Sequence, residues 1–121
     1  MIEQIKSSEI KKFVEKNPKT VLLDVRTEDE WISVGKPISD SLGIKTFFIT
    51  ISQDLGFIEN VKKEINKENK VLVMCAAGGR SIIAASLLQN EGYAAHNISD
   101  GFSGNGQDPG WKNSGLPSDN T

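Results

Sequence analysis

The sequence predicts an α/β fold in which parallel strands alternate with helices. Two continuous apolar runs, residues 20–25 and 71–74, have the composition of strands that are buried on both faces of a sheet. A third run at 93–98 also reads as a strand, and each run is joined to the next by segments with helical spacing. With 121 residues, the chain 1–121 is expected to form one domain around a single hydrophobic core.

The first predicted helix precedes the strand at 20–25. Ser7 or Ser8 is expected to cap this helix, which ends before Pro18. Its apolar face consists of Ile10, Phe13 and Val14.

After the strand, Thr27 and Glu30 stand at the spacing of a capping box. This pattern predicts a short helix that carries Trp31 toward the core.

The rest of the chain continues the alternation. Residues 35–41 read as a loop, and residues 45–51 are compatible with either a strand or an irregular apolar segment. One apolar face predicts a helix that contains Phe57, Ile58, Val61 and Ile65. A further helix is expected from about residue 80 until Gly92. The polar, turn-rich segment 103–110 predicts a mobile loop, and residues 118–121 a frayed tail.

The only cysteine, Cys75, follows the apolar run 71–74 and opens a loop that leads into a helix. This order places Cys75 at the carboxyl end of a strand, facing a helix N-terminus. Ligands of α/β sheets bind at such positions. The loop continues with Ala76, Ala77, Gly78, Gly79, Arg80 and Ser81.

The composition of this loop predicts a reactive thiolate. Small side chains allow successive backbone N–H groups to approach an anion, as in a nest. These amides, the helix dipole and the guanidinium of Arg80 should lower the thiol pKa from its free value of about 8.5. We therefore expect Cys75 and Arg80 to be catalytic and the segment 76–80 to bind the substrate. A small, inert, buried cysteine is the alternative.

Other polar and aromatic residues allow two interpretations. Asp24 and Arg26 either orient the site, with Ser81 in support, or form a structural ion pair, which we favour. His96 is expected to be structural, because a preformed thiolate needs no general base. Trp111 is expected to pack in the interior or, alternatively, to dock an acceptor.

Composition excludes several functional classes. A net charge of −2 and a pI of about 5.4 provide no basic field for nucleic acid, and no apolar stretch is long enough to cross a bilayer. The N-terminus lacks the features of a signal peptide, and a single free cysteine suits a reducing compartment, so we expect a cytoplasmic protein. One cysteine and one histidine cannot form a zinc site, and no cofactor is expected.

Three segments of the sequence, in order, resemble the signatures of single-domain rhodaneses. They are 23–26 followed by Glu30-Trp31, then 75–81, and finally 100–102 with Gly110-Trp111 and 115–117. The resemblance implies one rhodanese-like domain, a parallel sheet flanked by helices on both faces. It also implies sulfur transfer through a persulfide on Cys75. Thiosulfate, mercaptopyruvate or a small persulfide would be the donor, and cyanide, a thiol or a protein the acceptor.

The sequence departs from the family pattern at three places. Residues 35–40 differ from the usual Gly-His-Ile-Pro-Gly-Ala stretch, and the insertion 103–109 is expected to contribute to the rim of the site. Ala76 and Ala77 bring no charge, unlike the basic residues that thiosulfate-preferring members carry there, so the resemblance does not single out thiosulfate as the donor.

Two other functions compete with a sulfurtransferase. A module that carries sulfur to one protein partner, without turnover, would have the same motif. A cysteine-loop phosphatase or arsenate reductase also pairs a loop cysteine with an arginine. Its loop, however, is one residue longer than the four residues between Cys75 and Arg80.

Overall fold

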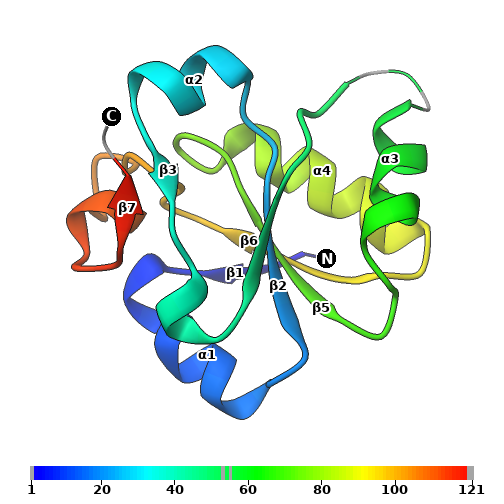
Figure 1. Cartoon of the computed structure of the whole chain (residues 1–121), viewed down its shortest axis with the longest axis horizontal. Helices are drawn as coiled ribbons and strands as arrows, with labels where there is room; N and C mark the ends of the chain where they lie inside the picture. Colours follow the sequence, from blue (N-terminus) through cyan, green and yellow to red (C-terminus); the bar gives the residue numbers. More distant parts are fainter. Residues whose placement is uncertain (1, 53, 55, 120–121) are drawn as a thin grey trace.

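A five-stranded parallel sheet forms the centre of the structure, a computed structural model that describes residues 2–52, 54 and 56–119 (Figure 1). The strands lie in the order β1-β6-β5-β2-β4, and every neighbouring pair is parallel. Their bounds are β1 (Glu3–Ile5), β2 (Thr20–Asp24), β4 (Lys45–Phe48), β5 (Lys70–Met74) and β6 (Ala94–Ile98). The predicted α/β class is confirmed, whereas the short edge strand β1 was not predicted.

Helices cover both faces of this sheet, as the resemblance implied. The helix α1 (Ile10–Lys16) packs on one face, while α3 (Gly56–Glu64) and α4 (Gly79–Asn90) pack on the other (Figure 1). The short helix α2 (Glu28–Ser33) follows the carboxyl end of β2. Four helices therefore appear where the sequence pattern predicts them.

Two apolar cores result from the alternation of side chains along the central strands. Leu23 and Val73 lie in the core beneath α3 and α4, whereas Leu22 and Leu72 lie in the core against α1. All four are fully buried. Burial on both faces explains why β2 and β5 read as continuous apolar runs rather than as alternating ones.

The predicted serine cap of the first helix is wrong. A short 3₁₀ helix, η1 (Ser7–Glu9), precedes α1, and neither has a side-chain cap from Ser7 or Ser8. Instead, the Ser7 hydroxyl donates to Asp100 Oδ1 at 2.9 Å. Asp100 is buried and needs hydrogen-bond donors, so this tertiary contact replaces the local cap.

The C-terminal segment folds back onto the middle of the chain. The strand β7 (Ser118–Asp119) pairs antiparallel with β3 (Lys36–Pro37), and the 3₁₀ helices η2 (Asp40–Leu42) and η3 (Trp111–Asn113) lie nearby in sequence. The expected fraying from residue 118 is therefore wrong for residues 118 and 119, and residues 120–121 lie outside the described residues. The predicted loop 35–41 likewise contains a short strand. None of the described helices is long and apolar enough to cross a membrane.

Candidate active site

Cys75 lies between the end of β5 and the start of α4, as the sequence predicts. Cys75 is only 1% exposed, whereas Ala77 and Gly79 of the same loop are exposed. Gly78 precedes α4 with a φ of 100°. A Cβ atom at this position would lie 2.3 Å from the carbonyl oxygen of Ser99, so the tight turn requires glycine.

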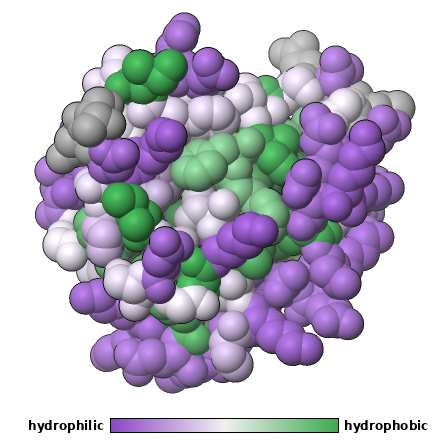
Figure 2. Space-filling view, in the orientation of Figure 1, coloured by the Kyte–Doolittle hydropathy of each residue, from purple (hydrophilic) through white to green (hydrophobic). Residues whose placement is uncertain are grey.

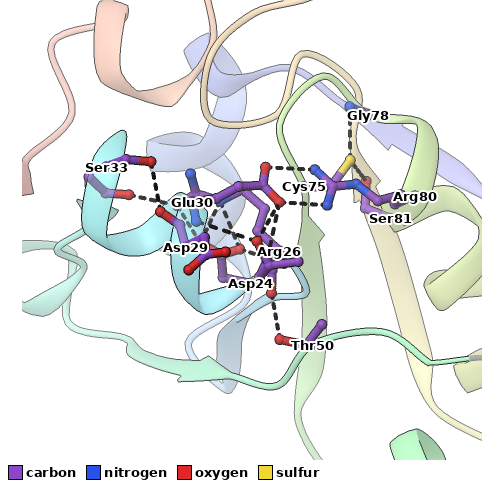
Figure 3. A network of polar contacts seen from close by, with 12 residues as sticks. Asp24, Arg26, Asp29, Glu30, Ser33, Thr50, Cys75, Gly78, Arg80 and Ser81 are labelled. Carbon is purple, nitrogen blue, oxygen red and sulfur yellow. Dashed lines mark hydrogen bonds and ion pairs between the residues drawn. The ribbon is translucent and has the colours of Figure 1, made fainter.

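The sulfur of Cys75 accepts hydrogen bonds from groups of its own loop and helix. Gly78 N lies 3.1 Å from Sγ, and Ser81 Oγ lies 3.3 Å from it (Figure 3). Burial raises the pKa of the Cys75 thiol, but hydrogen bonds from the Ser81 hydroxyl and from the amides of Ser81, Gly78 and Ala77 more than offset it. The pKa therefore lies below its ordinary value.

The charge of Arg80 acts on the thiol, as the sequence predicts, but without a hydrogen bond to the sulfur among the described contacts. Its guanidinium donates to both carboxylate oxygens of Glu30, at 2.7 and 2.8 Å (Figure 3). Arg80 and Cys75 interact only electrostatically. The hydrogen bond from Arg80 is the main reason why the pKa of Glu30 falls to about 2. The loop amides and Ser81, rather than the arginine, therefore contact the sulfur.

Glu30 is held in place by the predicted capping box of α2. Glu30 N donates to Thr27 Oγ1 at 3.3 Å, and Thr27 N donates to Glu30 Oε1 at 3.2 Å. The same carboxylate thus closes the start of α2 and holds Arg80. Trp31 is half-buried in edge-to-face contact with Phe48 rather than in the core.

Asp24 and Arg26 form a structural ion pair, the interpretation we favoured. Both side chains are 0% exposed, and Arg26 Nη2 lies 2.8 Å from Asp24 Oδ2. The guanidinium also donates to the Gly35 carbonyl at 2.9 Å and lies 4.3 Å from the centre of the Phe102 ring. These contacts hold the end of β2 against the start of β3 and the turn after β6.

A turn at residues 100–103 contacts the backbone of the Cys75 loop, residues 75–80, which we call the reactive loop. The sequence analysis did not assign the turn this role. Phe102 N donates to the Cys75 carbonyl at 2.8 Å, and Ser103 N donates to the Ala76 carbonyl at 2.9 Å. Gly101 has a φ of 58°, and a Cβ there would lie 2.4 Å from the Ala76 carbonyl oxygen. The insertion 103–109 therefore begins at the reactive loop. The sequence signals for this turn were the glycine and the match of residues 100–102 to a family signature.

Asn97 of β6 is a second residue that the sequence analysis missed. It is buried, and it accepts a hydrogen bond from Ser81. No apolar pattern could identify it, because its role depends on the position of β6 beside β5.

His96 and Trp111 lie away from the sulfur. The His96 ring contacts Phe13 edge-to-face at 5.0 Å, and its Nδ1 lies 3.2 Å from Glu3 Oε1. Burial lowers the pKa of His96. Trp111 is fully buried and donates from Nε1 to the Pro117 carbonyl, so it packs in the interior and cannot dock an acceptor at the surface. Among the described residues, no group of histidine, cysteine and acidic side chains could hold a metal ion.

A largely apolar pocket of about 1010 Å³ adjoins the reactive loop on the side of α3 and α4. Its lining consists of Ile51, Ser52, Asp54, Gly56, Ile58, Arg80, Ile83 and Leu87. Figure 2 shows exposed hydrophobic surface on this part of the molecule. Arg80 belongs both to the lining of this pocket and to the loop that follows Cys75.

Comparison with known proteins agrees with this architecture. An uncharacterized protein of Rickettsia prowazekii is 38% identical over 97% of both chains. The tRNA uridine(34) hydroxylase of Protochlamydia amoebophila is 33% identical over 75% of this chain, which corresponds to 28% of that protein. The crystal structure of Rv0390 from M. tuberculosis superposes with a TM-score of 0.84, at 29% identity and 98% coverage of both chains.

Two further findings define the relationship. The solution structure of the polysulfide-sulfur transferase homodimer from Wolinella succinogenes has the same fold, with a TM-score of 0.72 at 24% identity. The match covers 97% of this chain and 77% of that one. The Rhodanese family, described as the Rhodanese-like domain, matches residues 7–106. With its parallel sheet and its cysteine loop between strand and helix, the chain belongs to the rhodanese-like domain family.

Proposed function

We propose that this protein is a sulfurtransferase that carries a sulfane sulfur as a persulfide on Cys75. The observation that carries the proposal is the contact of Sγ with Gly78 N and Ser81 Oγ at the junction of β5 and α4. Thiosulfate, mercaptopyruvate or a small persulfide donates the sulfur, and cyanide, a thiol or a protein accepts it. Arg80 and the loop residues 76–79 bind the donor.

The reaction consists of two displacements at sulfur. In the first, the Cys75 thiolate attacks the sulfur to be transferred, which is the sulfane sulfur of thiosulfate or a persulfide and the thiol sulfur of mercaptopyruvate. A new S–S bond forms, and the S–S or C–S bond to the rest of the donor breaks. The leaving group departs with the electron pair of that bond, as sulfite when the donor is thiosulfate. The terminal sulfur then carries a negative charge, which the loop amides stabilise without reorganisation.

In the second displacement, the acceptor attacks the terminal sulfur, and Cys75 leaves as a thiolate. Cyanide becomes thiocyanate, and a thiol becomes a persulfide. The chain has only one cysteine, so an acceptor thiol comes from another molecule. A thiol that must stay free between cycles suits the reducing cytoplasm, where we place this protein.

The phosphatase alternative is disfavoured by the length of the Cys75 loop. In that family the loop between cysteine and arginine is one residue longer and encloses a tetrahedral oxyanion. The loop of four residues between Cys75 and Arg80 agrees with a single sulfur atom rather than a larger anion.

Steady-state kinetics test the proposal. We expect ping-pong behaviour with thiosulfate or a small persulfide as donor and cyanide or a small thiol as acceptor. Cys75→Ser should lose turnover and keep its fold. Activity near that of the unmodified protein in this variant would refute the mechanism. Stoichiometric loading of Cys75 without turnover on small acceptors, but with transfer to one protein, would instead identify a carrier.

A further inference from the structure

We infer that Asn97 is a positioning residue that opposes the ionisation of Cys75, because it competes with the thiolate for the single hydroxyl proton of Ser81. The inference rests on the proposed function insofar as Cys75 is the reactive group. Its basis is a chain of hydrogen bonds that runs from Cys75 through Ser81 and Asn97 to Gln4.

The orientation of the Asn97 amide is fixed by its neighbours. One neighbour is the Gly78 carbonyl oxygen, which lies 3.1 Å from Nδ2 and can only accept a hydrogen bond. The second amide proton of Nδ2 goes to Gln4 Oε1 at 2.8 Å. Both amide protons are therefore used, and Asn97 presents Oδ1, an acceptor, to Ser81. Gly78 belongs to the reactive loop, so the loop itself holds Asn97 in this orientation.

Ser81 has one proton and two groups that compete for it. A hydroxyl donates once, but both Asn97 Oδ1 and Cys75 Sγ lie within hydrogen-bond distance of Ser81 Oγ. Ser81 is fully buried among these partners. An acceptor left without a donor here incurs a desolvation cost.

The neutral thiol satisfies this arrangement completely. Its S–H donates to Ser81 Oγ, and the Ser81 hydroxyl donates to Asn97. In the thiolate, the sulfur needs the proton of Ser81, and Asn97 Oδ1 then faces a hydroxyl lone pair. Asn97 therefore favours the thiol, while the amides of Gly78 and Ala77 favour the thiolate.

This opposition has a chemical benefit. The nucleophilicity of a thiolate falls as its pKa falls, and attack is fastest when the pKa is near the ambient pH. A loop of amides alone would stabilise the thiolate strongly. The competition between Asn97 and Cys75 for the Ser81 proton limits that stabilisation, so the sulfur remains a good nucleophile.

The charged groups around Cys75 do not change in the test variants. Arg80 on α4 interacts electrostatically with the Cys75 thiol and with Asp24 at the end of β2. Arg80 also forms an ion pair with Glu30 on α2, and Asp24 forms one with Arg26. None of these side chains is among the hydrogen-bond partners that the described residues provide to Sγ. A change of the thiol pKa in the variants below thus reports on the competition for the Ser81 proton.

The test is a titration of the Cys75 thiol by thiolate absorbance and by the pH dependence of its alkylation, in the whole chain without sulfur donor. Asn97→Ala should lower the pKa by about one unit, which is a tenfold change in the ionisation equilibrium. Ser81→Ala should raise it by less than about half a unit, because the hydroxyl donates to the thiolate but its single proton is shared with Asn97. Adding Asn97→Ala to Ser81→Ala should have no further effect.

Ser86→Ala is the matched control, because its hydroxyl donates to the Ile82 carbonyl on the same helix, and it should not move the pKa. An unchanged or raised pKa in Asn97→Ala would overturn the inference. If that variant does not fold, Ser81→Ala alone decides. A pKa raised by more than about half a unit would show that Ser81 simply donates to the sulfur and that Asn97 does not compete. Because no sulfur transfer is measured, this result is independent of the proposed function.

Discussion

The pairs Asp24–Arg26 and Glu30–Arg80 both join an arginine to a carboxylate through two nitrogens at the carboxyl edge of the sheet (Figure 3). They differ in burial. Both side chains of the first pair are 0% exposed, whereas Arg80 and Glu30 are 41% and 26% exposed. In the first pair, water cannot solvate the charge that remains when its partner is lost. In the second pair, water can solvate that charge, because both side chains are in contact with solvent. The same chemistry therefore stabilises the fold in one place and leaves a cation available to the reactive loop in the other.

The largest expected effect breaks the buried pair. Asp24→Asn leaves the charge of Arg26 buried without its anion, so the free energy of unfolding should fall by about 3–5 kcal/mol. Glu30→Gln is the matched change in the exposed pair and should cost less than about 1 kcal/mol. Urea denaturation measures both. Equal losses in the two variants would contradict the comparison.

A smaller, kinetic effect is expected at the exposed pair. If Arg80 binds the charge of the donor, Arg80→Ala should reduce kcat/KM for thiosulfate several-fold, mainly through KM, and affect a neutral persulfide much less. Glu30→Gln should act in the opposite direction, because it releases the guanidinium for the anionic donor. If Arg80 only shapes the loop, Arg80→Ala should lower kcat for both donors. Kinetics that change with neither donor would remove Arg80 from the site.

The charge of the loop itself can be increased at Ala77, which is exposed. Ala77→Lys adds a second cation beside the donor, with a net gain of about 1 kcal/mol after desolvation and side-chain entropy are subtracted. We expect a several-fold higher kcat/KM for thiosulfate, which added salt reduces. An equal gain with a neutral donor, or a gain that is insensitive to salt, would show that charge at this loop does not select the donor.

The smallest effect is the pH dependence of the exposed pair. The pKa of Glu30 is lowered from 4.5 to about 2, so the folded state binds this proton less tightly than the unfolded state. The stabilisation is fully present above pH 4.5 and is lost as the pH falls toward 2. The difference in unfolding free energy between the unmodified protein and Glu30→Gln should therefore decline over this range, from less than about 1 kcal/mol. A constant difference between pH 5 and pH 2 would be inconsistent with the pair.

Local patterns were sufficient to predict the position of Cys75 and the fold around it. The buried strand β5, the loop and α4 are continuous in the chain, and the capping box of α2 requires only Thr27 and Glu30. Such features depend on the composition and spacing of neighbouring residues.

The partners of the loop could not be predicted, because they come from distant segments. Arg80 lies 50 positions from Glu30, and Ser81 lies 16 positions from Asn97. The supporting turn at 100–103 reaches Cys75 only after β6 has paired with β5. These contacts depend on strand order, which the local pattern does not contain.

The most direct test of the central claim is the intact mass of the protein after exposure to thiosulfate, mercaptopyruvate or a small persulfide, followed by an acceptor thiol. We expect that at least one donor adds the mass of one sulfur atom, that the acceptor removes it, and that Cys75→Ser gains nothing. Failure of all three donors to add sulfur, or an equal gain by Cys75→Ser, would contradict a persulfide on Cys75.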